Sequence, residues 1–323
     1  MATTTPVNGS ANFPANPNAF LAAVETIAQQ NVRAVISTNT IEDAFYEYDV
    51  KDGKVIEEAI IEMAKAQAFT PTANGAQPDL SPKDPVLKIR YFNNFEEKQY
   101  KVTKRPDEIR ACIAKGMTAE ELAAEILATL TAGEGDEDYK TERAIMEDKT
   151  NVGVDASASL FGGKVPQNAK GIMFAIRRMF NAVKGCNSKG LGSDASFKQG
   201  VPVSDIRIAV SEDVLALIDM TELASLFNLS KEEILGKVVK LPFDENYSGN
   251  RVLVYDRKAL GRATRTFDYS QDVMGTNRYS NHALTTSRAY FYNPLFKCLA
   301  LDVTEAVNAE EGKLIAAKGA KGA

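Results

Sequence analysis

The sequence is poor in the residues that most often carry catalysis or metal binding. It has no tryptophan and a single histidine, His282, and its three cysteines, Cys112, Cys186 and Cys298, lie far apart. No Ser-His-Asp or Cys-His arrangement can be built around one isolated histidine. An odd, scattered set of cysteines argues for a reducing compartment and against a disulfide framework or a CxxC metal site. These absences weigh against an enzyme without excluding one, and we expect no catalytic residues, no cofactor-binding residues and no metal site.

Long apolar runs are also missing. No run approaches the roughly 18 residues that span a bilayer. The first twenty residues contain neither a basic leader nor a continuous apolar core, so the sequence predicts no secretory signal and no membrane partner.

Charge of either sign is not in large excess. The chain has 38 Lys and Arg against 43 Asp and Glu, so it is not a basic nucleic-acid binder as a whole. Residues 1–150 carry 16 basic and 25 acidic side chains, and the remainder carries 22 and 18. Halves of opposite sign would help copies of the chain dock on one another. Ordinary solvated helix faces explain the same asymmetry equally well.

What the sequence does contain is a compact α/β module over residues 201–255. A short apolar strand at 206–210 is followed by Ser211, a helix N-cap, and Ser230 with Glu233 forms a capping box further on. Apolar runs of strand length follow at 238–241 and 252–255. No catalytic side chains stand out, so this stretch is interpreted as a structural platform.

A long β-ribbon is predicted between residues 45 and 103. Alternating patterns mark strands around Tyr46 and Tyr48, at Val55 to Met63, around Leu87, Ile89 and Tyr91, and at 97–103, with an Asp-Gly turn signal at 52–53 and a loop tip at 68–85. An arm of ten to twelve residues reaches ~35–40 Å at ~3.3 Å per residue. Because an isolated two-stranded ribbon is marginally stable, it should lie on its own body or on a neighbouring copy.

Helical patterns separate the ribbon from the platform. Helices are predicted at 20–30, at 105–115, from the capping box Thr118–Glu121 to about Gly133, at 139–149, and through Ile172 to Val183. The acidic run 134–138 is interpreted as a solvated loop because it lacks the EF-hand register. Residues 256–287 are interpreted as polar and turn-rich, and 289–303 as an aromatic strand region.

One glycine-rich stretch and one basic cluster could bind a ligand, but the sequence evidence for either site is weak. The spacing Gly185-x4-Gly190 lacks the Lys and Ser or Thr of a phosphate loop. The basic cluster Arg257, Lys258, Arg262 and Arg265 could touch phosphate or the acidic half of another copy. Both interpretations of the cluster stay open at this stage.

Three stretches carry a resemblance to a known family. They are GKVIEEAIIEM at 53–63, IAVSEDVLALIDMTELASLFNLSKEEILGKVV at 208–239 and SRAYFYNPLFKCLALDV at 287–303. With the order of parts, they make the chain similar to the major capsid proteins of tailed bacteriophages with the Hong Kong 97 fold, above all those of small short-tailed phages. The implied fold class is α+β. Its implied parts are an N-terminal arm (1–43), an extended β-ribbon loop (44–104), a peripheral domain with a long spine helix (105–167), an α/β axial domain (168–255), and a return to the peripheral domain with a C-terminal tail (256–323).

The resemblance implies a structural head protein of the virion, assembled in the host cytoplasm. Copies would form hexamers and pentamers of an icosahedral shell around double-stranded DNA, which they would contact weakly. No long helical segment precedes the arm, so a separate scaffolding protein, together with a portal, is the expected partner. Lysines such as Lys65 and Lys83 lie in the loop, but no partner asparagine for a covalent cross-link is identifiable.

Subunit contacts are expected on the ribbon, at Tyr46, Tyr48, Leu87, Ile89 and Tyr91. Three alternatives remain: a cellular nanocompartment shell of the same fold, a soluble α/β ligand-binding protein or enzyme with a pocket at the 185–200 loop, and a DNA-binding module.

Overall fold

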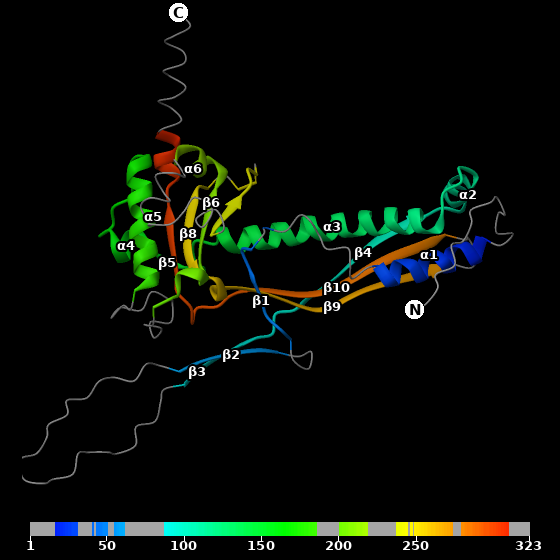
Figure 1. Ribbon diagram of the computed structural model, residues 1–323, viewed down its shortest axis with the longest axis horizontal. Helices are drawn as coiled ribbons and strands as arrows, with labels where there is room; N and C mark the ends of the chain where they lie inside the picture. Colours follow the sequence, from blue (N-terminus) through cyan, green and yellow to red (C-terminus); the bar gives the residue numbers. More distant parts are fainter. Residues whose placement is uncertain are drawn as a thin grey trace, which may run out of the picture. The chain divides into compact units, whose positions relative to one another are not determined.

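The computed structural model describes residues 17–31, 41, 43–50, 55–61, 87–185, 200–218, 237–244, 246–247, 249–273 and 279–309 (Figure 1). The chain folds as two compact units. The first contains α1 and the segments 95–141 and 264–289, and the second is built from 41–94, 142–263 and the segment that begins at Tyr290. The predictions for the first sixteen residues, the loop tip, the 186–199 loop with Cys186, the Ser230 capping box and the tail lie outside the described residues.

The elements follow the chain in this order: α1 (Pro17–Asn31), β1 (Tyr46–Glu47), β2 (Ile56–Ile61), β3 (Leu87–Phe92), β4 (Glu96–Lys104), α2 (Pro106–Ala114), α3 (Ala119–Glu147), β5 (Val154–Asp155), α4 (Ala156–Leu160), α5 (Ala169–Lys184), η2 (Val203–Asp205), β6 (Ile206–Ser211), α6 (Glu212–Leu217), β7 (Val238–Leu241), β8 (Arg251–Asp256), η3 (Arg257–Ala259), β9 (Leu260–Val273), β10 (Ser280–Tyr292) and β11 (Cys298–Asp302).

The second unit is organised around a five-stranded sheet in the order β5-β11-β8-β6-β7. Its central strands β11, β8 and β6 are antiparallel neighbours, and β5 and β7 are parallel to the strands they flank. Strands β6 and β8 are buried along their whole length, and the apolar face of α5, including Ile172, Ile176 and Met179, packs on them. The predicted strands at 206–210, 238–241 and 252–255 are confirmed, as is Ser211, whose Oγ accepts a hydrogen bond from the Val214 N–H.

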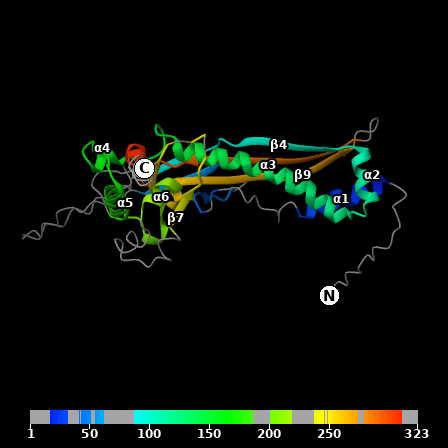
Figure 2. The same ribbon diagram turned by 90° about the horizontal axis from the view of Figure 1, so that it is seen from above.

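The first unit pairs helices with the long strands. Strand β10 runs antiparallel to β4, from Ser280 opposite Lys104 to Arg288 opposite Glu96. Figures 1 and 2 both show α3 running alongside these strands, with α1 beside them. A shared core forms where Leu122, Ile126 and Leu130 of α3 meet other buried side chains of α1, β9 and β10. The capping box is confirmed: the Glu121 N–H donates to Thr118 Oγ1, and the Thr118 N–H donates to the Glu121 carboxylate.

The predicted end of this helix near Gly133 is wrong. Helix α3 continues unbroken to Glu147, so the acidic run 134–138 is helical and not a loop. Glu134 and Asp138 are buried, and both pair with Arg288 of β10. A distant arginine therefore neutralises part of the charge that made this run resemble a solvated loop, and Lys140 pairs with Asp136 and Glu137.

The interpretation of residues 256–287 as turn-rich is also wrong. Strands β9 and β10 fill most of this stretch. Their polar residues are largely threonine, serine and tyrosine, and the ladder with β4 satisfies the backbone groups of β10. The aromatic region 289–303 is divided between the end of β10 and β11. Tyr46 and Glu47 pair with Gly261 and Arg262 of β9 rather than with the strand that follows the Asp-Gly signal.

Candidate assembly site

The β2–β3 ribbon has two chemically different faces. The strands are antiparallel, with Ile56 opposite Phe92, Glu58 opposite Arg90 and Ala59 opposite Ile89. Residues directly opposite one another share a face, and successive residues alternate between faces. One face therefore carries Ile56, Glu58, Arg90 and Phe92.

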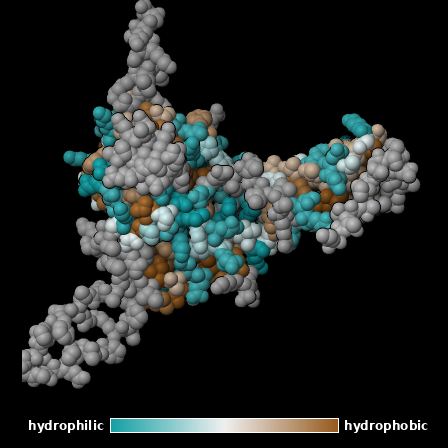
Figure 3. All heavy atoms as spheres, in the orientation of Figure 1, coloured by the Kyte–Doolittle hydropathy of each residue, from teal (hydrophilic) through white to brown (hydrophobic). Residues whose placement is uncertain are grey.

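The other face, called here the outer face, consists of Val55, Glu57, Ala59, Leu87, Ile89 and Tyr91. Leu87 is 53% exposed, Ile89 38% and Tyr91 63%. In Figure 3, hydrophobic atoms gather over the described part of the ribbon, at the lower left of the molecule. Of the six large hydrophobic side chains that are exposed among the described residues, four lie on this face: Val55, Leu87, Ile89 and Tyr91. The outer face is thus an apolar surface that nothing in the described chain covers.

The opposite face anchors the ribbon to its own protomer. Ile56 is 3% exposed, and the Phe92 ring stacks on Phe291 with centroids 4.0 Å apart. Glu58 lies 3.8 Å from the Lys258 ammonium, and Asn94 Nδ2 donates to the Tyr290 carbonyl. These contacts hold the base of the ribbon and leave the outer face directed away from the core.

Tyr48, one of the five residues expected at a subunit contact, is buried in its own protomer. Its hydroxyl donates to the Lys258 carbonyl, its ring packs on Phe291 at 5.3 Å, and burial raises its pKa. A Cβ at Gly261 would stand 2.5 Å from Phe291 and 2.8 Å from the Tyr48 ring, so this packing requires glycine there. Tyr46 is half-buried against Tyr48, with Arg257 and Lys258 near its ring. The outer face brings together only Leu87, Ile89 and Tyr91 of the five.

The segment leading into the ribbon is held by Asp43. Its carboxylate pairs with Arg207 at 2.8 Å and Arg257 at 3.0 Å. Asp43 has a positive φ of 58°, a conformation that aspartate tolerates better than most residues. The Tyr255 hydroxyl donates to the Ala44 carbonyl 3.0 Å away, so the entry to the ribbon is fixed from two sides.

The basic cluster after the platform is engaged within the chain. Besides Arg257 with Asp43 and Lys258 with Glu58, Arg262 contacts Glu142 at 3.4 Å and Glu47 at 3.5 Å. Glu142 also accepts the Ile41 N–H, and burial raises its pKa to about 7. Only Arg265 of the cluster is exposed without a carboxylate partner among the described residues. Three of the four cations of the cluster are therefore engaged in internal ion pairs, which favours neither the phosphate nor the subunit-docking interpretation.

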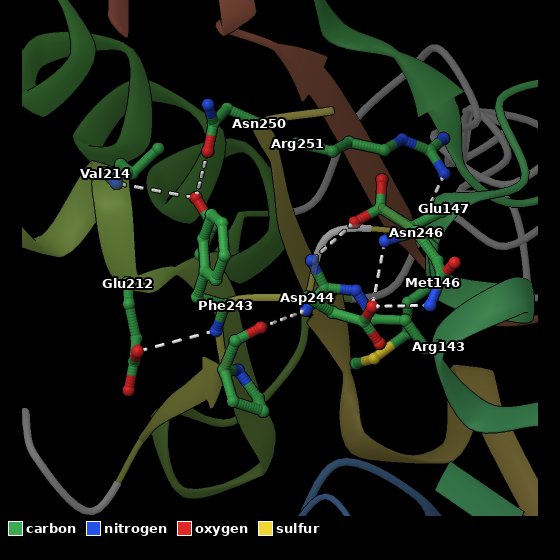
Figure 4. A network of polar contacts seen from close by, with 12 residues as sticks. Arg143, Met146, Glu147, Glu212, Val214, Phe243, Asp244, Asn246, Asn250 and Arg251 are labelled. Carbon is green, nitrogen blue, oxygen red and sulfur yellow. Dashed lines mark hydrogen bonds and ion pairs between the residues drawn. The ribbon is translucent and has the colours of Figure 1, made fainter. Parts of the chain in front are cut away.

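The loop between β7 and β8 is fixed by a network around Arg143 (Figure 4). This buried guanidinium pairs with Glu147 at 3.0 Å, donates to the Pro242 carbonyl and lies over the Tyr247 ring. The Phe243 N–H donates to Glu212, while the Phe243 side chain is 68% exposed. Arg251 donates to the Met146 carbonyl at the end of α3 and to the Asp148 and Val152 carbonyls in the segment that follows, so the network ties this loop region to the end of the helix.

The groups that could have supported catalysis are structural. His282 is fully buried between the Tyr269 hydroxyl at 2.5 Å and Ser280 Oγ at 3.0 Å, and burial lowers its pKa to about 4. Cys298 begins β11 of the five-stranded sheet and is fully buried, which raises the pKa of its thiol to about 12. Across the described residues, no cluster of three or more His, Cys, Asp or Glu could hold a metal ion. The described helices include none that is long and apolar enough to cross a membrane.

The sequence analysis missed Val55 as a member of the outer face, because the strand predicted at 55–63 had the least regular alternation of the four strands predicted between residues 45 and 103. The signal was present, since Val55 stands at even spacing from Glu57 and Ala59.

Solved phage capsids share this fold. The capsid of Staphylococcus phage Andhra is 13% identical, with a TM-score of 0.58, and the match covers 83% of this chain and 85% of that one. The head structure of Helicobacter pylori bacteriophage KHP40 is 11% identical, with a TM-score of 0.51, and covers 80% and 87%. No curated protein sequence matches the chain. The fold is thus that of the Hong Kong 97 class of phage head proteins.

The family follows from the sequence itself. A model of the Phi29-like phage major capsid protein family matches residues 3–301, and the chain belongs to this family. The family is structural and not enzymatic. The chain is accordingly a major head protein of the virion, and its copies assemble into a multimeric shell.

Proposed function

We propose that the shell is icosahedral, is built from hexamers and pentamers of this chain, and encloses double-stranded DNA. Neighbouring copies are joined in part by the β2–β3 ribbon, whose outer face covers the adjacent subunit. One observation supports the contact between copies through the ribbon: four of the six exposed large hydrophobic side chains among the described residues lie on its outer face. Exposed apolar patches on a soluble protein commonly mark interaction sites.

The geometry of the ribbon supports a contact with another copy. Two strands alone are marginally stable, and the anchored face already uses the contacts that its own protomer supplies. A specific interface buries ~1,600 Å² in total, so the outer face is one part of a larger contact. Leu87, Ile89 and Tyr91 form its centre, and Tyr46 contributes at most an edge because it is half-buried beneath Arg257 and Lys258.

The remaining assignments complete this proposal. Residues 1–43 act as an arm, 44–104 as the extended loop, 105–167 with 256–323 as the peripheral domain and tail, and 168–255 as the axial domain. Assembly takes place in the host cytoplasm with a separate scaffolding protein and a portal. The packaged DNA is contacted weakly, because the acidic net charge of the chain disfavours tight binding to phosphate.

Negative-stain electron microscopy of the purified full-length chain, with light scattering of the same sample, tests the proposal. Rings, tubes or closed shells are the expected result, either from the chain alone or after co-expression with the scaffolding protein. A compact monomer at every protein and salt concentration, with and without that partner, would contradict it.

A further inference from the structure

One stretch of the chain departs sharply from the mixed charge of the rest. Between Asp155 and Asp194 there is no acidic residue, although the whole chain has 43. The same span contains six basic residues, and four of them lie on α5: Lys170, Arg177, Arg178 and Lys184. This helix contains no acidic residue.

The four cations occupy the exposed side of the helix. The buried side is the apolar face that packs on the central sheet, and all four basic side chains are exposed. Lys170, Arg177 and Lys184 are spaced by seven residues, which places them in one row at intervals of ~10 Å. Arg178 is held over the Phe161 ring at 5.4 Å. The exposed Asn181 adds an amide donor to the same side of the helix.

Most acidic residues of α3 differ from these cations, because they have ion-pair partners within the chain. Glu125 pairs with Lys104, Asp136 with Lys140, and the buried pair Glu134 and Asp138 with Arg288. Across the residues that the structure describes, no carboxylate lies within ion-pair distance of the four cations of α5. The carboxylates of α3 are therefore largely paired within the protomer, whereas the cations of α5 remain available to a partner.

We propose that the exposed face of α5 is the surface that contacts the phosphate backbone of duplex DNA, without reading its sequence. This inference rests on the proposed enclosure of double-stranded DNA. A duplex carries one negative charge per ~1.7 Å of its axis, so a row of cations spaced by ~10 Å finds phosphates in any register. An acidic protein segment could bind the same row of cations only if its carboxylates had a matching spacing. The four cations are concentrated on one helix of a chain with net charge -5, which keeps the contact local and weak.

The salt dependence of binding gives the expected size of the effect. Each phosphate neutralised contributes about −0.9 to the slope of log K against log salt, so four cations predict a slope of about −3.6. The variant Lys170→Gln with Arg177→Gln should reduce that slope by about 1.8 and weaken binding roughly 60-fold at 0.1 M salt. Glutamine preserves the helix, because its helix propensity is close to that of lysine and arginine.

The experiment measures binding of the full-length protein to a fluorescent duplex of about 30 base pairs and mixed sequence, across a salt series. A matched control carries Lys101→Gln and Lys115→Gln, which remove two exposed cations from β4 and the end of α2. The control should keep the slope of the original protein and the α5 variant should lose about half of it. Equal slopes in all three proteins, or equal losses in both variants, would overturn the proposal.

Electron microscopy of the same three proteins separates this inference from the proposed function. Shells from all three, with a reduced slope only in the α5 variant, support both statements. If the α5 variant alone forms no shells, its exposed face is a contact between copies and the DNA assignment fails. If the original protein forms no shells under any condition but binds DNA through α5, the shell proposal fails and the DNA surface stands.

Discussion

Replacing Leu87 and Ile89 together with aspartate should block shell assembly and leave the protomer folded. Full burial of a leucine or isoleucine contributes ~1.5–3 kcal/mol, and these side chains are 53% and 38% exposed. Covering what remains exposed is therefore worth about 2 kcal/mol per ribbon, or about 30-fold in the association constant of one contact. Each of the two buried, unpaired carboxylates costs a further ~1–3 kcal/mol, so the contact weakens by about 4–8 kcal/mol.

Electron microscopy and light scattering report assembly, and circular dichroism with urea denaturation reports the folded protomer. The matched control is Gln99→Asp with Thr103→Asp, which adds the same charge at exposed positions of β4 without removing an apolar side chain. The control should assemble. Normal shells from the ribbon variant would refute the assignment of the outer face. An unfolded ribbon variant would show that Leu87 and Ile89 support their own core.

Three further changes test the contacts that hold the protomer. Asp43→Ala should lower the free energy of unfolding by about 1–2 kcal/mol, because Arg207 and Arg257 lose their carboxylate and alanine disfavours a positive φ. Urea denaturation measures this change, and an unchanged midpoint would contradict the stabilising role of Asp43. Arg288→Met should cost about 3–5 kcal/mol, since Glu134 and Asp138 stay buried without their cation, and an unaltered melting temperature would exclude that role. The third change concerns pH. The histidine has a pKa of 6.5 in the unfolded chain, whereas burial lowers the pKa of His282 in the folded chain to about 4. Stability should therefore fall by up to about 3 kcal/mol as the pH drops from about 6.5 to about 4. His282→Gln should remove this acid sensitivity, and an identical pH profile in the variant would contradict the assignment.

Local signals in the sequence located much of the α/β unit correctly. The Thr118–Glu121 capping box and the Ser211 N-cap both form as predicted, because a cap depends only on residues within one turn of the helix end. Strands β6, β7 and β8 were recognisable because they are short and mostly apolar; β6 and β8 are buried along their whole length, and β7 exposes only Lys240.

The errors arose where distant residues decide the structure. Gly133 and the acidic run after it have the composition of a loop, but Arg288 lies about 150 positions further along the chain and makes a continuous helix stable there. Strands β9 and β10 were missed for a similar reason. Their polar composition gives no strong periodic signal, and their sheet partners are distant in the sequence: β10 pairs with β4, and β9 lies between β1 and β10.

The candidate site was predictable in part. The alternation of Leu87, Ile89 and Tyr91 placed these three side chains on one face, since strand geometry depends only on the local backbone. The same alternation does not show whether Tyr48 is buried by its own protomer or by a neighbouring copy. Its burial depends on the absence of a side chain at Gly261, more than 200 residues later.

The most direct test of the account is a cryo-electron microscopy map of assembled particles at a resolution that shows side chains. We expect a closed shell in which Leu87, Ile89 and Tyr91 of each copy lie buried against the adjacent copy. A shell in which the outer face of the ribbon faces solvent, or packs on its own protomer, would contradict the central claim.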